Sequence, residues 1–244
     1  MFVAGVATDE GSPSMSLLAI GAHPDDVELG CGATLLLARR AGLPVTVVVM
    51  TDGSRGPGGV GVRAAEQRCA ATRLGATLIM LGYPDGRLAA TTEVIGRLEA
   101  IIAVAAARIV LTHAREDSHQ DHRAAAEATV AAARAHSQVL HYESPTTLGF
   151  APTLFAEVTG VVADKLDLLR EHRSQVLGSA RVDLAAISAL ATVRGAQGRV
   201  GAAEAFVPTR ARLALPDIAD LTDIAGARVA LPVVGPHLDQ EAAR

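Results

Sequence analysis

Aromatic residues and cysteines are scarce in this sequence. Aromatic side chains make up 2% of the 244 residues, and tryptophan is absent. A core must therefore be built from alanine, valine, leucine and isoleucine, and the hydrophobic content of 50% allows a sizeable one. The two cysteines, Cys31 and Cys69, belong to no CxxC pair. This usage argues against a disulfide framework and predicts a reducing, cytoplasmic location.

Clustered positive charge and long apolar runs are also missing. The formal net charge is -4, and no basic block occurs. We expect no nucleic-acid partner, because binding to phosphates needs clustered Lys and Arg. We also expect no membrane partner, because no apolar run reaches the roughly 20 residues that span a bilayer. Residues 1–15 lack a basic start and a long apolar core, which predicts a flexible leader and not a signal peptide.

Apolar runs of strand length alternate with helix-like segments along most of the chain. We expect strands at residues 17–21, 45–50, 77–81, 109–112, 139–143 and 155–158. We expect helices at residues 29–41, 62–74, 92–107, 123–135, 162–172 and 184–195. The alternation predicts an α/β fold, a Rossmann-like three-layer α/β/α sandwich with a mostly parallel sheet and right-handed crossovers. The pattern does not give the order of the strands.

The alternation weakens after residue 178, and prolines stand at positions 216, 232 and 236. We therefore expect one folded domain over residues 16–210 and an irregular C-terminal arm over residues 211–244.

A first group of chemically able side chains stands where the first predicted strand meets the first predicted helix. His23, Pro24, Asp25 and Asp26 are consecutive there. Open α/β sheets bind their ligands at such strand ends. Pro24 restrains its own backbone and that of His23, so His23 and Asp26 can converge on one point. The plainer interpretation is a surface histidine beside two helix-capping aspartates.

A second group, Asp117-Ser118-His119-Gln120-Asp121-His122, follows the fourth predicted strand. In a parallel sheet both groups lie on the same edge. His23, Asp26 and one of His119 and His122 then supply two imidazoles and one carboxylate. Three protein ligands with further positions open are typical of a catalytic Zn²⁺ site, and Fe²⁺ uses a similar triad. The alternative is a polar, helix-capping loop with incidental histidines.

The segment AHPDDVELGCGATL, followed downstream by H-x-D-H, resembles the PIG-L/LmbE-like family of zinc-dependent N-deacetylases. Members of this family deacetylate N-acetylglucosamine conjugates, including precursors of mycothiol and bacillithiol. The resemblance covers about residues 16–207, which makes residues 16–210 the expected deacetylase domain. It continues through TDG, R-x-x-E, PDGRL, YES, HRSQ and RG…AEAF.

The resemblance implies a role for each member of the two groups. His23, Asp26 and His122 resemble the zinc ligands, and Asp25 resembles the general base. His119 resembles the histidine that stabilises the oxyanion or helps to protonate the leaving amine. Asp121 resembles the carboxylate that orients His119 or a metal ligand. The proton for the amine comes from Asp25 or His119.

Arg63 and Asp85 match positions that contact the sugar or its linked group. Each also has a plainer interpretation, a surface ion pair of Arg63 with Glu66 and a turn residue after Pro84. The loop at residues 53–56 reads Gly-Ser-Arg-Gly, where many relatives have Gly-Glu. The family-like loop contacts to substrate are therefore not carried over.

The leading hypothesis is a hydrolase that removes the N-acetyl group from an N-acetylglucosamine-type conjugate, with a zinc-bound water as nucleophile. The conjugate is a thiol precursor or a glycosylated natural product. One alternative is an amidase that cleaves a larger acyl or thiol conjugate. Another is a non-catalytic, Rossmann-like nucleotide-binding module with a structural metal. Compact relatives assemble as trimers or hexamers, which suggests a homo-oligomer.

Several other residues receive structural interpretations. We expect Cys31 to be buried, with Gly30 and Gly32 letting the first helix pack closely on the sheet. We expect His113 to make a structural hydrogen bond, with a contact at the rim of the site as the alternative. We expect Glu204 to pack near the site, with a substrate contact as the alternative.

Overall fold

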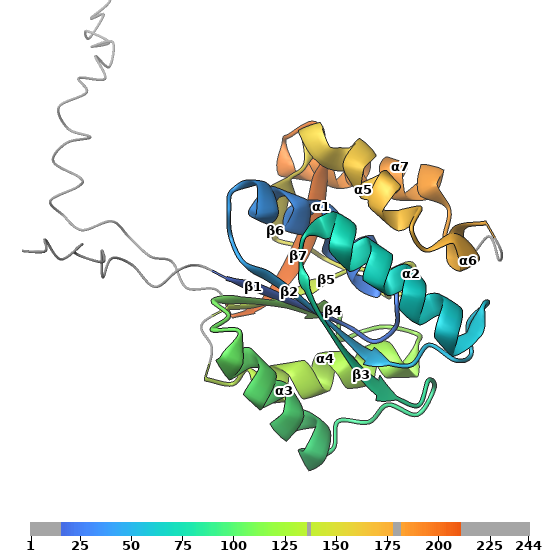
Figure 1. The fold of residues 1–244 in the computed structure, drawn as a ribbon. Helices are drawn as coiled ribbons and strands as arrows, with labels where there is room; N and C mark the ends of the chain where they lie inside the picture. Colours follow the sequence, from blue (N-terminus) through green and yellow to red (C-terminus); the bar gives the residue numbers. More distant parts are fainter. Residues whose placement is uncertain (1–15, 136–137, 178–181, 211–244) are drawn as a thin grey trace, which may run out of the picture. The chain divides into compact units, whose positions relative to one another are not determined.

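A seven-stranded sheet in the order β3-β2-β1-β4-β5-β7-β6 forms the centre of the fold (Figure 1). The computed structural model describes residues 16–135, 138–177 and 182–210. The predicted leader at 1–15 and the predicted arm at 211–244 lie outside these described residues. The strands are β1 (Leu17–Gly21), β2 (Val45–Thr51), β3 (Thr77–Tyr83), β4 (Ile109–His113), β5 (Gln138–Tyr142), β6 (Leu154–Glu157) and β7 (Ala203–Arg210).

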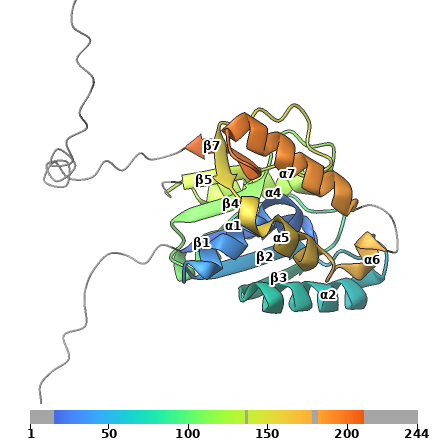
Figure 2. The same cartoon turned by 90° about the horizontal axis from the view of Figure 1, so that it is seen from above.

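Helices cover both faces of this sheet, which confirms the three-layer prediction. In Figure 1, α3 and α4 lie on one face, and α1, α2, α5 and α7 lie on the other; Figure 2 looks onto the second face, where α2, α5 and α7 are seen. The helices are α1 (Asp26–Arg40), α2 (Gly59–Leu74), α3 (Thr92–Val104), α4 (Gln120–Ala132), α5 (Val162–Leu169), α6 (Arg173–Val176) and α7 (Leu184–Gly198), with a short 3₁₀ turn at Thr159–Val161. Among the described residues, no helix is long and apolar enough to cross a membrane.

Aliphatic residues fill both interfaces between sheet and helices. On one face Leu18 and Ile20 of β1 pack with Leu98 of α3. On the other, Ala19 of β1 packs with Leu35 of α1. Because β1 is covered on both faces, its sequence reads as an unbroken apolar run, as in central parallel strands.

The predicted parallel pairing is correct for the first five strands. Strand β1 pairs in parallel with β2 and β4, β2 with β3, and β4 with β5. The adjacency of β1 and β4 matters most, because it brings the two predicted groups of polar side chains to neighbouring strand ends.

Strand β7 was not expected from the sequence. It lies between β5 and β6 and is antiparallel to both. Pro208 lies within it, opposite Leu140, where the pairing with β5 shifts register. Proline within a strand removes a backbone donor and disguises the pattern, which explains the omission. Most predicted helix bounds differ by a few residues, and α1 begins at Asp26, three residues before the predicted start.

Helix α1 is broken near its first third. Cys31 has non-helical angles of φ -144° and ψ 16°, and its side chain is buried, as predicted. The neighbouring Gly30 packs against Tyr142, and a Cβ atom at Gly30 would lie 2.1 Å from that ring. The predicted close packing by small residues is confirmed at Gly30.

An ion pair from other elements fills the break in α1. The Lys165 ammonium donates to the Leu29 carbonyl over 2.6 Å, and it pairs with the Glu204 carboxylate over 2.6 Å. Glu204 in turn accepts from the backbone N–H groups of Ala33 and Thr34, over 3.0 and 2.7 Å. The pair therefore satisfies backbone groups that the interrupted helix leaves open.

Candidate active site

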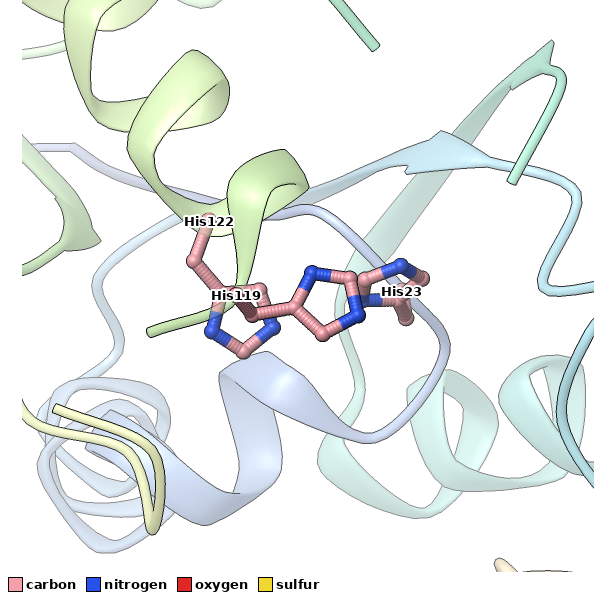
Figure 3. A group of neighbouring side chains, drawn as sticks. All are labelled: His23, His119 and His122. Atoms are coloured by element: carbon pink, nitrogen blue, oxygen red, sulfur yellow. The ribbon is translucent and has the colours of Figure 1, made fainter. Parts of the chain in front are cut away.

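Both predicted groups of polar side chains lie at one edge of the sheet. His23 and Asp26 follow β1, and the group from Asp117 to His122 follows β4. Figure 3 shows the rings of His23, His119 and His122 gathered where these segments meet. The structure therefore brings together side chains that are about a hundred residues apart in sequence.

Asp26 lies between three histidines. Its Oδ2 atom is 3.3 Å from His23 Nδ1 and 3.2 Å from His113 Nε2, and its Oδ1 atom is 3.4 Å from His122 Nε2. Burial alone would raise the pKa of this carboxyl, but His122 and His113 hold the pKa well below its usual value. Asp26 is thus a carboxylate at neutral pH, the form that binds a cation.

His23 is surrounded by carboxylates. Its Nε2 atom lies 3.2 Å from Asp121 Oδ2 and 3.2 Å from Asp85 Oδ1, in addition to the contact with Asp26. Burial would lower the pKa of this imidazole, but the hydrogen bonds to Asp121, Asp26 and Asp85 raise it to about 12. Without another cation at the site, His23 holds a proton against this negative charge.

His122 is held in place by a carboxylate on its outer side. Its Nδ1 atom lies 3.1 Å from Asp117 Oδ2, which also accepts a hydrogen bond from Ser144 Oγ over 2.8 Å. If Nδ1 carries the proton, the Nε2 lone pair faces Asp26. Metal-binding histidines are oriented by this kind of outer carboxylate. The sequence placed Asp117 in the second group but gave it no role.

His119 caps the N-terminus of α4. Its Nδ1 atom accepts from the backbone N–H of Asp121 over 3.2 Å. Its ring stacks on His122 with centroids 4.6 Å apart, and meets the edge of His23 at 4.7 Å. Partial burial, together with His23 and His122, lowers the pKa of His119. A partly exposed, neutral imidazole therefore lies beside the two more buried ones.

Asp121 connects three parts of the site. Its carboxylate accepts from the backbone N–H of Gly86 over 2.6 Å and of Leu88 over 3.2 Å, and it faces His23. Its backbone N–H holds His119. The sequence left open whether Asp121 orients His119 or a ligand, and the geometry gives it a contact with each.

Asp25 points to different partners from its neighbour Asp26. It adopts a left-handed conformation, with φ 100°, and its backbone N–H donates to Gln67 Oε1 over 3.1 Å. Arg63 Nη2 donates to the Pro24 carbonyl over 2.6 Å and lies 3.3 Å from Asp25 Oδ1. Gln67 and Arg63, both on α2, thus hold the backbone at Pro24 and Asp25 in this strained conformation.

The Asp25 carboxyl is tuned for proton exchange near neutrality. Burial, the largest cause, and the nearby negative charge of Asp26 raise the pKa of Asp25 to about 7. Arg63 acts in the opposite direction and lowers this pKa. A carboxyl with this pKa can both take and return a proton at physiological pH.

Arg63 and Asp85 lie at the site but are partly engaged by the protein. Arg63 does not form the surface ion pair with Glu66 that the spacing offers, because Glu66 accepts from Ser174 instead. The Asp85 carboxylate contacts His23 and accepts from the backbone N–H of Arg55 over 2.9 Å. Both residues line a cavity whose wall also includes His23, His119 and His122.

His113 contacts the site, which was the alternative to a purely structural role. It ends β4, is fully buried, and stacks on His122 with centroids 4.0 Å apart. Its Nε2 atom accepts from the backbone N–H of Ala22 over 3.0 Å, so the predicted structural hydrogen bond is confirmed. The same Nε2 atom lies 3.2 Å from Asp26 Oδ2, and His113 forms with Asp26 and His122 a group whose donor atoms could hold a metal.

The donor set fits a divalent cation. His23 Nδ1 lies 3.3 Å from Asp26 Oδ2 and His122 Nε2 lies 3.4 Å from Asp26 Oδ1, each close to the separation of about 3.4 Å expected between two tetrahedral zinc ligands. His23, His119 and His122 also place one ring nitrogen each within 4.8 Å of one another, as do donor atoms of Asp26, His113 and His122. Donor atoms of His23, Asp85 and Asp121 form a third such group, so His122 and His23 each belong to two of the three. The predicted ligands His23, Asp26 and His122 each belong to at least one of these groups, although no single group contains all three.

A cavity of about 240 Å³ opens onto these side chains. Asp25, Asp26 and the histidines form one part of its wall, and Arg55, Arg63 and Gln120 form another. Its size and polar lining suit a small hydrophilic group next to the metal ligands.

Comparison with known proteins gives a consistent picture. The family model for PIG-L, GlcNAc-PI de-N-acetylase, matches residues 18–133. The chain is 40% identical over 168 residues to the uncharacterized deacetylase YaiS of Escherichia coli (strain K12). That match covers 65% of this chain and 90% of YaiS.

Solved structures share the fold. The conserved protein TT1542 of Thermus thermophilus has a TM-score of 0.74 at 28% identity, covering 83% of this chain and 98% of that one. N,N'-diacetylchitobiose deacetylase of Pyrococcus horikoshii has a TM-score of 0.70 at 23% identity, covering 80% and 83%. The 4-carboxy-2-hydroxymuconate hydratase GalB of Pseudomonas putida KT2440 reaches 0.74 at 20% identity, covering 83% and 99%. Proteins with this fold therefore include both a deacetylase and a hydratase, so the function must be inferred from the residues of the site.

Proposed function

The chain belongs to the PIG-L family of deacetylases, and on this premise we propose that it hydrolyses the N-acetyl group of an N-acetylglucosamine-type conjugate with a bound divalent metal. The conjugate is a thiol precursor or a glycosylated natural product. The observation that carries the proposal is the His23, Asp26 and His122 donor set beside a carboxyl, Asp25, that is held apart from it by Arg63.

In this proposal His23, Asp26 and His122 hold the metal, with Zn²⁺ as the first choice and Fe²⁺ as the alternative. A bound divalent ion polarises the acetamide carbonyl and lowers the pKa of water at the site. Asp117 keeps the Nε2 atom of His122 directed at Asp26. Asp121 and Asp85 keep His23 in position from the opposite side.

Asp25 takes the proton from the attacking water, and its pKa of about 7 suits that task. His119 lies at the cavity wall, where it can donate a hydrogen bond to the oxygen that becomes negative in the tetrahedral intermediate. The leaving amine must be protonated before it departs. Asp25 can return to the amine the proton that it took from water, and His119 is the alternative donor, in its protonated form.

Arg63 and Asp85 are proposed to contact the sugar at the cavity wall. Each residue already makes hydrogen bonds within the protein. We therefore propose that each both positions its neighbours in the site and contacts the substrate. Arg55 and Gln120 also line the cavity, and both are exposed. They offer further polar contacts for a carbohydrate.

The test is an amine-release assay of the zinc-loaded protein over a panel of N-acetylglucosamine glycosides, N-acetylated disaccharides and larger N-acyl conjugates. We expect turnover of at least one N-acetyl substrate, lost on chelation and restored by zinc. Turnover of larger acyl conjugates alone would support the amidase alternative. Tight nucleotide binding without hydrolysis would overturn the proposal in favour of a binding module.

A further inference from the structure

A buried chain of polar side chains reaches the backbone of Asp25 and takes no part in the proposed mechanism. Gln67 of α2, Glu28 of α1 and His172, which precedes α6, are each at most 1% exposed. Gln67 Oε1 accepts from the backbone N–H of Asp25 over 3.1 Å, and Gln67 Nε2 donates to Glu28 Oε1 over 2.7 Å. His172 Nε2 lies 3.5 Å from the other oxygen of Glu28. The three side chains thus connect the start of α6 to the candidate general base.

Glu28 determines which end of the Gln67 amide faces Asp25. A glutamine amide has an acceptor oxygen at one end and a donor nitrogen at the other. Because the Glu28 oxygen accepts a hydrogen bond, it selects the nitrogen of Gln67, and the amide oxygen must then face the N–H of Asp25. With the amide reversed, two acceptors would meet at Glu28 and two donors would meet at Asp25.

His172 brings a counter-charge to the far oxygen of Glu28. Burial alone would lower the pKa of this imidazole, but Glu28 raises the pKa above its usual value. Within the described part of the chain, Glu28 Oε2 and both ring nitrogens of His172 have no hydrogen-bond partner. The outer end of the chain is therefore held by the attraction between two buried charges, and a buried carboxylate needs such a partner.

The backbone of Asp25 requires support of this kind. Its φ of 100° is left-handed, a conformation that a residue other than glycine keeps only where its surroundings fix it. The Asp25 carbonyl accepts from the N–H of Leu29 over 2.9 Å, as the first bond of α1. The N–H of Asp25 lies before the helix and has no helical carbonyl to bind. Gln67 is the group that holds it.

The chain is separate from the wall of the active-site cavity. Among the described residues that line this cavity, Gln67, Glu28 and His172 do not occur. Arg63, which holds the neighbouring carbonyl of Pro24, does line it and can therefore contact substrate. The three residues of the chain can act on the reaction only through the position of another group.

We propose that Gln67, Glu28 and His172 are positioning residues for proton transfer by Asp25. The chain holds the strained peptide, and the peptide directs the Asp25 carboxyl away from the metal ligands. This inference rests on the proposed deacetylase function and adds three residues to those on which its rate depends. Loss of the chain should lower kcat and leave KM and zinc content unchanged.

The experiment measures kcat, KM and zinc content of the zinc-loaded full chain, with a glycoside that the amine-release panel identifies as a substrate. Gln67→Met keeps a side chain of similar size and removes both ends of the amide. We expect kcat to fall by about 10- to 100-fold, because a small displacement of a catalytic group has an effect of this size. Should this variant not fold, Gln67→Asn takes its place, because its shorter amide cannot reach both Asp25 and Glu28.

Matched variants separate positioning from stability. Glu28→Gln keeps an acceptor oxygen for the Gln67 amide and should retain most of the kcat, whereas Glu28→Met removes it and should match Gln67→Met. His172→Leu should cause a smaller loss, because it acts through Glu28. Ser174→Ala removes a hydrogen bond to Glu66 that also joins α6 to α2 but does not lead to the candidate general base. This control should lower the melting temperature without changing kcat.

The backbone amide of Asp25 gives a measurement that needs no turnover. Nuclear magnetic resonance of the isotope-labelled, zinc-loaded protein follows hydrogen exchange at this amide. We expect slow exchange in the native protein and in Ser174→Ala, and faster exchange in Gln67→Met and Glu28→Met.

The outcomes separate this inference from the proposed function. A kcat that follows the melting temperature across all variants, or an Asp25 amide that is unchanged in Gln67→Met, would overturn the inference and leave the deacetylase proposal standing. If no glycoside is deacetylated, the proposed function fails, and the exchange at Asp25 still decides whether the chain holds this peptide.

Discussion

Asp25 and Asp26 are adjacent in the sequence, yet their surroundings shift the pKa values of the two carboxyl groups in opposite directions. Asp26 faces three histidines, and two of them, His122 and His113, hold its pKa low and keep it ionised. Burial and the charge of Asp26 raise the pKa of Asp25 to about 7. Two identical side chains are thereby suited to different tasks, cation binding and proton transfer.

Asp25→Asn should retain the metal but lower kcat by about 10²- to 10⁴-fold, because an amide cannot accept the proton from water. Metal content by elemental analysis and the rate of amine release check this prediction. Asp164→Asn, at an exposed ion pair with Arg40, is the control and should keep full activity. Unchanged turnover in Asp25→Asn would remove Asp25 from the mechanism.

Asp117→Asn should weaken zinc binding by about 10- to 100-fold, because it removes the carboxylate that orients His122. His122→Ala should abolish stoichiometric binding. A competition titration with a chromogenic chelator measures both affinities, and Glu116→Gln, at the exposed neighbouring position, should match the native protein. Equal affinities in all four proteins would mean that His122 is not a ligand.

Zinc binding should release protons and weaken as the pH falls. Burial would lower the pKa of both imidazoles, but carboxylates raise it to about 12 for His23 and about 9 for His122. Both therefore carry protons at pH 7, and the metal must displace about two of them. Calorimetry in buffers of different ionisation enthalpy counts these protons. A buffer-independent enthalpy, with an affinity that does not change between about pH 6 and pH 8, would contradict the assignment.

Among the elements, α1 shows how an irregular helix is stabilised by distant parts of the chain. Its break at Cys31 opens backbone groups on both sides, and Lys165 and Glu204 satisfy them. The AEAF segment was recognised in the sequence as family-like, but its glutamate could only be assigned to packing. Glu204 binds backbone groups at the break in α1, and no local sequence pattern predicts that break.

Glu204→Gln should destabilise the fold by about 3–5 kcal/mol, because it leaves the Lys165 ammonium buried without its counter-charge. Urea unfolding followed by circular dichroism gives this free energy. Glu157→Gln, at an exposed position in the neighbouring strand β6, should change it by less than about 0.5 kcal/mol. The double variant Lys165→Met/Glu204→Gln should lose less free energy of unfolding than the two single variants lose in sum. Strictly additive losses would mean that Lys165 and Glu204 do not stabilise each other.

The regular elements could be predicted because their signals are local. The unbroken apolar run at residues 17–21 appears in the structure as strand β1, as the sequence indicated. Strand β7 could not be predicted, because Pro208 masks its pattern and its antiparallel place between β5 and β6 depends on long-range pairing.

At the scale of the whole molecule, the order of the strands determines the site. The paired groups after β1 and β4 could be placed at one sheet edge from the sequence, since parallel strands end on the same side. That β1 and β4 are neighbours could not be deduced, and this adjacency is what brings His23 to Asp121. The supporting roles of Asp117 and His113 also depend on it.

The central claim is that His23, Asp26 and His122 hold one catalytic metal ion. It is tested most directly by titrating metal-stripped protein with zinc while measuring both bound metal and amine release. We predict that the two rise together and level off at about one zinc per chain, and that His122→Ala shows neither. Full turnover by protein that binds no metal would contradict the account.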